Sequence, residues 1–404
     1  MRILYIIVNL LFVTIACLGQ DFGEFKKQIL FTAGNDGYFN YRLPSIVSTK
    51  NGVLLAFCGA RNGDGGDWAP IDIVMRRSED AGKTWSAIQS IAFGNGLPCE
   101  NPTPVVDYVT NEIHLLYHLN FAKCFYIKST DDGKTWTKPV DITPAIDGFN
   151  KIYPWNVLAP GPGHGIQLNN GRLIVPFWLS NGGKSHRPSI VVPVYSDNHG
   201  KTWKAGDMAV SDNDTTVIPN EACCVQLADG RVMFNSRNES HNYRRLVNYS
   251  PDGVSNWSEP LFADAFFEPI CAASLCRYTI QPDEPKNRIL FCNPDSRQNP
   301  VMVLKDTPRS AFTRSRSNLT MRMSYDEGIT WPVTKVIDPG FSAYSDITVT
   351  PDGLIHCLYE GKSINEEGKN VYSLILATFN LEWLTDGKDR HFVVNKENCK
   401  ESEL

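Results

Sequence analysis

The stretch Ser-Glu-Asp-Ala-Gly-Lys-Thr-Trp at residues 78–85 decides the fold, because its pattern recurs along the chain. Clean copies occur at residues 129–136, 196–203 and 324–331, and a degraded copy occurs at 250–257. Each copy follows an apolar or alternating run, which is the usual context of a β-hairpin turn. In such a turn the Asp side chain can accept backbone N–H groups, Gly tolerates positive φ, and Trp packs beneath the turn. The repeat therefore predicts a protein built from successive β units.

The tryptophans that end the copies measure the length of one unit. Trp85, Trp136, Trp203, Trp257 and Trp331 are separated by 51, 67, 54 and 74 residues, a mean of about 62, which fits one four-stranded blade per interval. The residues from 20 to 404 leave room for roughly six such blades, and no amphipathic pattern is longer than about three helical turns. We predict an all-β protein, a six-bladed β-propeller of four-stranded antiparallel blades, as a single domain over 20–404. A seven-bladed propeller is the alternative.

Composition limits the classes of partner. The chain has 404 residues, of which 42% are hydrophobic, and nine tryptophans are available for a large core. A formal net charge of −5 gives no sign of a surface for polyanions, so a nucleic acid is not an expected partner. No long Ser/Gly/Pro run or charge block indicates a linker between domains.

The first residues are typical of a secretory signal peptide. Arg2 precedes an apolar run over residues 3–18, and the small residue Gly19 follows it. We predict a signal peptide over 1–19, export (to an extracellular, periplasmic or lysosomal location depending on the host), and no stable membrane span after its removal. Lipidation at Cys17 and an uncleaved anchor are the alternatives, and both also export the protein.

Cysteines and glycosylation sequons follow from the same expectation of export. Eleven cysteines less Cys17 leave an even number, so we expect some to pair, with Cys271 and Cys276 as candidates and the connectivity open. Five N-x-S/T sequons make glycosylation worth testing if the host is a eukaryote, and they begin at Asn213, Asn238, Asn248, Asn256 and Asn318.

Several short motifs occur in an order that resembles the sialidase (neuraminidase) family with Asp-box, or BNR, repeats. Their sequences are Tyr-Arg-Leu-Pro at 41–44, Arg-x5-Asp at 61–67, Asn-Glu at 220–221, Asn-Ser-Arg at 235–237, Arg-Ser-Asn-Leu-Thr at 316–320, Ala-Tyr-Ser-Asp at 343–346 and Leu-Tyr-Glu at 358–360. The ordered set covers essentially the whole mature chain and is far more specific than any one member. The resemblance implies an exo-α-sialidase, a glycoside hydrolase that removes terminal sialic acid from glycoproteins, glycolipids and oligosaccharides with retention.

Three arginines match the positions of a carboxylate clamp in this family. A sialic acid carries a carboxylate on the carbon that is attacked, and guanidinium groups bind a carboxylate through charge-assisted hydrogen bonds. The resemblance assigns this role to Arg42, Arg237 and Arg316. Arg309 and Arg314 are competing candidates for the third position.

A tyrosine is the expected nucleophile. Sialidases are an exception to the usual pair of catalytic carboxylates in retaining glycosidases. An anionic nucleophile would be repelled by the substrate carboxylate, whereas a neutral phenol would not. Because the pKa of a phenol is about 10, it needs a neighbouring base. The resemblance assigns Tyr344 as the nucleophile, through a tyrosyl-enzyme intermediate, and Glu221 as its base.

Asp67 is the expected general acid for the leaving oxygen and then the base that activates water. It follows the glycine-rich residues 62–66, which suit a loop that closes over substrate. Asp64 is the alternative on the same loop, whereas Asp72 is expected to belong to a strand.

Three further residues complete the expected site. The resemblance assigns Arg61 to a ring hydroxyl and Glu360 to an ion pair with Arg42. Asn101 stands where many family members have Asp in an Asp-Pro-Thr motif that contacts a ring substituent. Asn keeps the capacity for hydrogen bonds but loses the charge, so the recognition of the 4-hydroxyl or N-acyl group is expected to differ.

Two rival functions are compatible with this pattern. A trans-sialidase would share the same residues but exclude water, and a non-catalytic glycan-binding propeller would not need both Tyr344 and Glu221. The eight histidines are scattered and Cys223-Cys224 is not a zinc pattern, so neither a metal nor another catalytic cofactor is expected.

Overall fold

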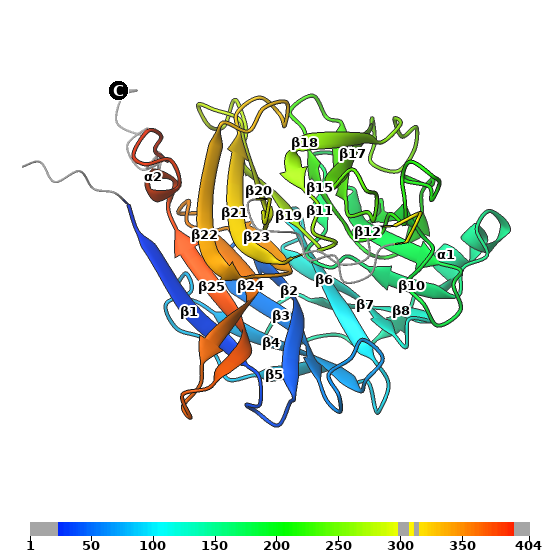
Figure 1. Cartoon of the computed structure of the whole chain (residues 1–404), viewed down its shortest axis with the longest axis horizontal. Helices are drawn as coiled ribbons and strands as arrows, with labels where there is room; N and C mark the ends of the chain where they lie inside the picture. Colours follow the sequence, from blue (N-terminus) through cyan, green and yellow to red (C-terminus); the bar gives the residue numbers. More distant parts are fainter. Residues whose placement is uncertain (1–22, 298–306, 311–314, 392–404) are drawn as a thin grey trace, which may run out of the picture.

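The computed structural model describes residues 23–297, 307–310 and 315–391, and almost all of its regular structure is β-strand. Six antiparallel sheets are arranged around a common centre, with their first strands innermost (Figure 1). This arrangement confirms the predicted six-bladed propeller. The predicted signal peptide at 1–19, with Cys17, lies outside the described residues.

The strands follow the chain blade by blade. The first three blades consist of β2 (Asn40–Ser48), β3 (Leu54–Arg61), β4 (Ile71–Ser78) and β5 (Gln89–Ala92); β6 (Cys99–Asp107), β7 (Glu112–Leu119), β8 (Lys123–Ser129) and β9 (Val140–Asp141); and β10 (Val157–Pro160), β11 (Ile166–Gln167), β12 (Leu173–Ser180), β13 (Ser189–Ser196) and β14 (Lys204–Ala205). The next three consist of β15 (Ala222–Gln226), β16 (Val232–Ser236), β17 (Arg244–Ser250) and β18 (Leu261–Phe267); β19 (Ser274–Thr279), β20 (Arg288–Pro294), β21 (Ser317–Ser324) and β22 (Val333–Phe341); and β23 (Ser345–Val349), β24 (Ile355–Ile364), β25 (Asn370–Phe379) and β1 (Phe25–Thr32). Two short helices, α1 (Pro144–Asp147) and α2 (Leu381–Leu384), and a 3-10 turn at Gly148–Lys151 lie outside the sheets.

The third blade differs from the prediction by one extra strand. Both β10 and β11 pair with β12, so the innermost strand of this blade is split in two. The loop at 161–165 separates the halves, and its Gly161 and Gly163 both have positive φ, which interrupts regular pairing. A glycine-rich loop therefore lies against the propeller axis.

The repeated turn joins the third strand of a blade to the fourth. In the first copy Asp80 accepts hydrogen bonds from the Thr84 backbone N–H at 2.8 Å and from its hydroxyl at 2.6 Å, while the Ser78 hydroxyl accepts from Gly82 N at 2.9 Å. The Thr84 hydrogen bonds lower the pKa of Asp80 to about 2. In the third copy Asn198 accepts from the Thr202 N–H at 2.9 Å and donates to its hydroxyl, so the amide preserves the turn with one hydrogen bond reversed.

Five turns for six blades follow from how the ring closes. The fourth strand of the last blade is β1, which comes from the beginning of the described chain and pairs antiparallel with β25. No hairpin therefore joins the third strand to the fourth in that blade, and the repeated turn has no position there.

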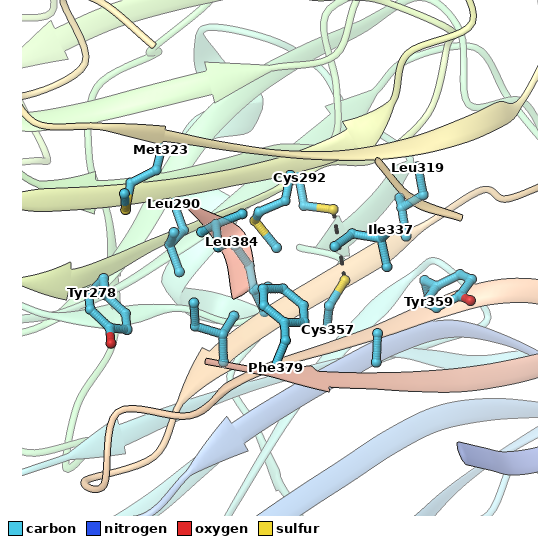
Figure 2. Packing of buried hydrophobic residues seen from close by; sticks show 14 of the residues in the cluster. Tyr278, Leu290, Cys292, Leu319, Met323, Ile337, Cys357, Tyr359, Phe379 and Leu384 are labelled. Carbon is cyan, nitrogen blue, oxygen red and sulfur yellow. Dashed lines mark hydrogen bonds between the residues drawn. The ribbon is translucent and has the colours of Figure 1, made fainter. Parts of the chain in front are cut away.

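The core lies between adjacent blades. Figure 2 shows one such cluster, in which Cys292 and Leu319 of the fifth blade pack against Cys357 and Phe379 of the last blade. These four side chains are fully buried. Burying an apolar side chain of the size of Leu or Phe contributes about 1.5–3 kcal/mol, so such clusters fix the ring of blades.

Cysteine pairing is a point where the expectation was wrong for the described residues. All nine cysteines there are free thiols, including Cys271 and Cys276. The thiols of Cys292 and Cys357 come within 3.8 Å of each other across the blade interface.

The asparagines of the five sequons differ in how exposed they are in the fold. Asn238 and Asn248 are fully buried, and their amides donate to the carbonyls of Arg244 and Ala209 at 2.8 Å. The folded protein cannot carry a glycan at either, whereas Asn213 and Asn256 are exposed.

No helix in the described part of the chain is long and apolar enough to span a bilayer.

The strand order places one end of the ring apart from the other. Neighbouring strands in each blade are antiparallel. The start of the first strand therefore lies at the same end of the ring as the end of the second strand and the start of the third. The repeated turns follow the ends of third strands and therefore lie at the opposite end. The motif residues fall at the first end, as the following geometry shows.

Candidate active site

All six blades contribute to a pocket of about 280 Å³ at this end of the ring. The predicted residues that line it are Arg42, Arg61, Asp67, Asn101, Glu221, Arg237, Arg316 and Tyr344. Glu360, the remaining predicted residue, lies behind Arg42. Residues from positions 42 to 344 therefore meet in one cavity.

Tyr344, Glu221 and Arg237 form a closed hydrogen-bonded group. The Tyr344 hydroxyl donates to Glu221 Oε1 at 2.6 Å, and Arg237 Nη1 donates to the Tyr344 oxygen at 2.7 Å and to Glu221 Oε2 at 2.5 Å. Only 6% of Tyr344 is exposed. Burial and the Glu221 carboxylate raise the pKa of Tyr344 well above its ordinary value, against the opposing effect of the nearby arginines. Tyr344 is thus a neutral phenol that already donates to a carboxylate.

Backbone hydrogen bonds at the ends of strands hold these three side chains at the pocket. Glu221 immediately precedes β15 and Arg237 immediately follows β16, so the two lie side by side at the end of one hairpin. The Arg237 N–H donates to the Glu221 carbonyl at 2.9 Å, which extends the ladder beyond the strands. Tyr344 precedes β23, and its neighbour Ala343 donates to the Glu360 carbonyl at 2.9 Å.

Arg42 and Arg316 hold their guanidinium groups over the ring of Tyr344, at 5.3 and 5.4 Å from its centroid. Glu360 fixes Arg42, since Arg42 Nε donates to Glu360 Oε1 at 3.1 Å and the Leu43 N–H donates to the same oxygen at 3.0 Å. Burial alone would lower the pKa of Arg42, but Glu360 and the other acidic groups raise it by more. The net shift is upward, so the guanidinium group stays charged. The expected pairing of Glu360 with Arg42 is therefore present.

Of the two described candidates for the third arginine of the clamp, Arg316 is the one that lies in the pocket. Arg316 lines the pocket and donates to the Ile270 carbonyl. Arg309 instead donates to Asp212 at 2.8 Å and does not line the pocket. Arg314 lies outside the described residues.

Asp67 lies at the rim of the same pocket. Arg61 Nη1 donates to Asp67 Oδ1 at 2.8 Å, and Arg42 Nη1 lies 3.5 Å from the same oxygen. Burial acts to raise the pKa of Asp67, but Arg61 and then Arg42 lower it, to about 2. Asp64 is exposed, accepts from the Gly66 N–H at 2.9 Å and does not line the pocket, so Asp67 is the candidate acid. As predicted, Asp72 belongs to a strand, β4.

Glu100 was missed by the sequence analysis. It is fully buried and accepts from Arg61 Nε and Nη2, both at 2.8 Å. Burial raises the pKa of Glu100, against the opposing effect of Arg61. A side chain at Gly59 would approach Glu100 Oε1 within 2.4 Å, so the glycine makes room for this pair. Arg61 also donates to the Gly65 carbonyl at 3.0 Å, and it therefore acts mainly to hold the Asp67 loop.

Asn101 adjoins this pair in β6. It is 3% exposed, has a φ of +56°, and its amide donates to the Pro160 carbonyl at 2.8 Å. Asn tolerates the left-handed region better than most residues, which fits its place at a β-bulge. The side chain is thus held rigidly at the pocket wall.

An aromatic wall, also missed from the sequence, lies beside Asp67. Phe121 and Trp178 line the pocket, and the His186 ring packs 5.0 Å from Phe121 and 5.3 Å from Trp178. Trp68 stacks on His186 at 5.8 Å. Burial lowers the pKa of His186, against the opposing effect of Asp67, whose Oδ2 lies 3.9 Å from His186 Nδ1. This side of the pocket suits an apolar substituent, in contrast to the arginines around Tyr344.

A buried ion pair supports the nucleophile segment from behind. His164 Nδ1 lies 2.7 Å from Asp346 Oδ1, and the Ile46 N–H donates to the other oxygen at 2.9 Å. Burial acts to lower the pKa of His164, but Asp346 raises it above its ordinary value. The contact joins the third and last blades two residues from Tyr344.

Comparison with known proteins places the chain in a family. A family model described as a BNR repeat-like domain matches residues 43–357. This chain belongs to the BNR repeat-like family. The family member is 32% identical over 394 residues to the sialidase of Micromonospora viridifaciens, covering 89% of this chain and 54% of the relative. It is also 27% identical over 397 residues to the exo-alpha-sialidase of Aspergillus fumigatus, covering 87% of this chain and 86% of the relative.

A solved structure shows the same fold. The Trypanosoma rangeli sialidase in complex with sialic acid superposes with a TM-score of 0.63 at 20% identity, over 87% of this chain and 58% of that chain. This BNR family member spans about half the length of the Micromonospora relative. The resemblance to sialidases that the motifs indicated is confirmed.

Proposed function

We propose that this chain is an exo-α-sialidase that hydrolyses terminal sialic acid from sialylated glycans with retention. One observation carries the proposal: a neutral tyrosine donates to a glutamate at 2.6 Å inside a ring of three guanidinium groups. A glycan-binding module needs the arginines to hold a carboxylate, but it has no use for a buried phenol on a base. The sialidase names of the relatives support the same activity.

Substrate binding begins with the carboxylate. Arg42, Arg237 and Arg316 hold it through charge-assisted hydrogen bonds, which places the anomeric carbon above the Tyr344 oxygen. The aromatic wall beside Asp67 takes an apolar part of the sugar, such as an N-acyl methyl group. The sialic acid bound to the Trypanosoma rangeli sialidase supports this substrate class.

The first chemical step forms a tyrosyl-enzyme intermediate. The Tyr344 oxygen attacks the anomeric carbon, Glu221 takes the phenolic proton, and Asp67 gives a proton to the leaving oxygen. In the second step Asp67 removes a proton from water, which attacks the same carbon. The Tyr344 oxygen then leaves and recovers its proton from Glu221, and two inversions give net retention.

Asp67 must be protonated before it can act as an acid, although Arg61 and Arg42 lower its pKa to about 2. A bound sugar carboxylate neutralises part of the positive field of Arg42 and excludes water from the rim. Both effects favour the neutral carboxyl group and raise the pKa of Asp67. Binding of the correct substrate therefore favours the protonated form of Asp67, which can act as the acid.

Turnover of sialyllactose tests the proposal. The wild-type chain should release sialic acid, and the α-anomer should appear first by NMR if the reaction retains configuration. Tyr344→Phe removes the attacking atom but keeps the ring between Arg42 and Arg316, so it should reduce kcat to near background while ligand binding persists. Binding without turnover in the wild type would instead indicate a glycan-binding propeller.

The same assay separates a hydrolase from a trans-sialidase. With excess isotopically labelled lactose as acceptor, a trans-sialidase would form labelled sialyllactose, whereas a hydrolase gives mainly free sialic acid. Export remains part of the proposal, supported by the signal-like residues 1–19.

A further inference from the structure

A hollow of about 320 Å³ lies on the propeller axis, at the end opposite the active site. The innermost strand of every blade contributes to its wall, and these strands surround the centre of the ring in Figure 1. The wall residues from these strands include Val47, Val106, Ile166, Val225, Cys276 and Thr348. Most of them lie toward the ends of their strands, which is the end of the ring that carries the repeated turns. We call this cavity the axial hollow.

The wall of the axial hollow suits the apolar part of a small molecule. Three valines and two isoleucines line it, and no acidic side chain is among its described lining residues. Cavities of about 300–1,000 Å³ with mostly apolar walls and a few polar groups are typical of small-molecule sites. Two polar side chains of the wall already have partners, since Gln167 donates to Asp107 at 2.7 Å and Arg277 donates to Glu327 at 2.6 Å. A polar ligand group therefore has to be bound by other residues.

His164 supplies a cationic donor to the axial hollow. Its Nδ1 lies 2.7 Å from Asp346 Oδ1, whereas its Nε2 makes no hydrogen bond to a described residue and is not shut off from solvent. The side chain is 13% exposed and lines this hollow but not the active-site pocket, so Nε2 is open to the hollow. Both ring nitrogens carry protons only in the imidazolium form. Burial opposes that form, but the Asp346 carboxylate raises the pKa of His164 above its ordinary value.

Thr348 offers a second donor in the axial hollow. It follows Asp346 by two positions in β23, so the two side chains lie on the same face of that strand. The Thr348 hydroxyl oxygen accepts from the Ser48 N–H at 3.0 Å, and its own proton is donated to no described residue. A cationic donor and a hydroxyl donor inside an apolar wall match a carboxylate that carries a short hydrocarbon chain, because charge-assisted hydrogen bonds hold carboxylates most strongly.

We propose that the axial hollow binds a small aliphatic monocarboxylate. The carboxylate accepts from His164 Nε2 and from the Thr348 hydroxyl, and the hydrocarbon chain packs against the valines of the innermost strands. The site is separate from the proposed sialidase activity, because the axial hollow and the active-site pocket share no described lining residue. Its test therefore stands whether or not the chain cleaves sialosides.

An NMR titration of the whole chain with 3-methylbutanoate at pH 6 tests the site. The imidazole signals of His164 should shift as this probe binds. The matched probe 3-methylbutanamide has the same hydrocarbon chain without the charge, and it should bind about tenfold more weakly or worse. Equal affinities for the two probes, or titration without a shift of the His164 signals, would overturn the proposal.

The affinity for the carboxylate should also depend on pH. Asp346 is the acidic group that faces His164, and Cys276, Arg277 and Tyr108 also line the hollow. Burial raises the pKa of Cys276 to about 12, so this thiol stays neutral between pH 6 and 9. Binding should be strongest where His164 is charged and should weaken as pH rises through its raised folded-state pKa, because neutral Nε2 presents a lone pair to the anion. A constant affinity from pH 6 to 9 would contradict the role of His164.

Substitutions at Ile280 test the site without touching the contact of His164 with Asp346. Ile280 is half-buried, lies just after β19 and lines the hollow. Ile280→Glu places a negative charge beside the bound anion and should weaken it by about threefold or more, whereas the matched variant Ile280→Gln should bind as the wild type does. Equal binding by these two variants would count against the site.

Arg316→Ala shows which of two cavities holds the probe, because the arginines of the active-site pocket also suit a carboxylate. Arg316 does not line the axial hollow, so this variant should keep the wild-type affinity and the shift of the His164 signals. Loss of binding in Arg316→Ala would place the probe in the active-site pocket and overturn the proposal.

Discussion

Arg316→Ala is the cleanest perturbation of the carboxylate clamp. Replacing Arg42 would leave the buried Glu360 without its cation, and replacing Arg237 would remove a donor from both Glu221 and Tyr344. Arg316 donates to a backbone carbonyl, at Ile270, so its loss strands no carboxylate. The measured effect should therefore come from the ligand.

The magnitude follows from one partly desolvated, charge-assisted contact. Arg316 is half-buried and lies over the Tyr344 ring, where a bound carboxylate would meet it. Hydrogen bonds to charged groups contribute about 1.5–3 kcal/mol. Arg316→Ala should therefore raise the Kd of 2-deoxy-2,3-didehydro-sialic acid by about 13- to 160-fold.

Calorimetric titration of two ligands isolates the interaction. The second ligand is the same sugar with a neutral carboxamide in place of the carboxylate. The affinity lost on this replacement should be smaller in Arg316→Ala than in the wild type by about 1 kcal/mol or more, as in a double-mutant cycle.

Arg309→Ala serves as the control, because Arg309 pairs with Asp212 away from the pocket. It should leave both affinities within twofold of the wild type. The reasoning is refuted if Arg316→Ala binds the carboxylate ligand as tightly as the wild type, or if the carboxamide loses as much affinity as the carboxylate does.

Two further predictions concern Asp67 and His164. Asp67→Ala should reduce kcat/KM for a natural sialoglycan by about 10²–10⁴-fold, but much less for a sialoside with an acidic phenol as leaving group, which departs without a proton; equal losses on both would show that Asp67 is not the acid. His164→Gln should lower the free energy of unfolding by about 1.5–3 kcal/mol at pH 5, because the variant loses the charged contact with Asp346. Since the folded-state pKa of His164 is raised, this stabilisation is complete below its ordinary pKa of about 6.5 and is lost as pH rises through the folded value. Denaturant unfolding from pH 5 to 9 measures it, and a difference that grows with pH would contradict the assignment.

The fold was predictable because its signals are local. The repeated turn depends on residues within eight positions, and the contacts of Asp80 with Thr84 and Ser78 recur in the other copies. The number of blades followed from the spacing of the tryptophans. The missing sixth turn and the split strand around Gly161 did not, because each depends on how distant parts of the chain meet.

The candidate site was predictable only where a residue belongs to a motif. Glu100 and the aromatic wall around His186 escaped notice because their partners come from other strands or blades, and nothing in the sequence beside them marks a pocket. The cysteines show the reverse error. An even count indicated pairing, but Cys271 is buried and Cys276 half-buried, and both pack as small apolar side chains without it.

Closure of the ring through β1 has a consequence for biosynthesis. During synthesis from the N-terminus, β1 emerges first, yet its partner β25 is among the last strands to be made. Until then the nascent chain carries an open strand edge, and such edges invite pairing with other chains. The contact of Arg42 in the first blade with Glu360 in the last also joins the two ends of the ring. A chain that stops before residue 370 contains all three arginines of the clamp but leaves β1 without its partner strand, so its catalytic competence would report how far the site depends on closure of the ring.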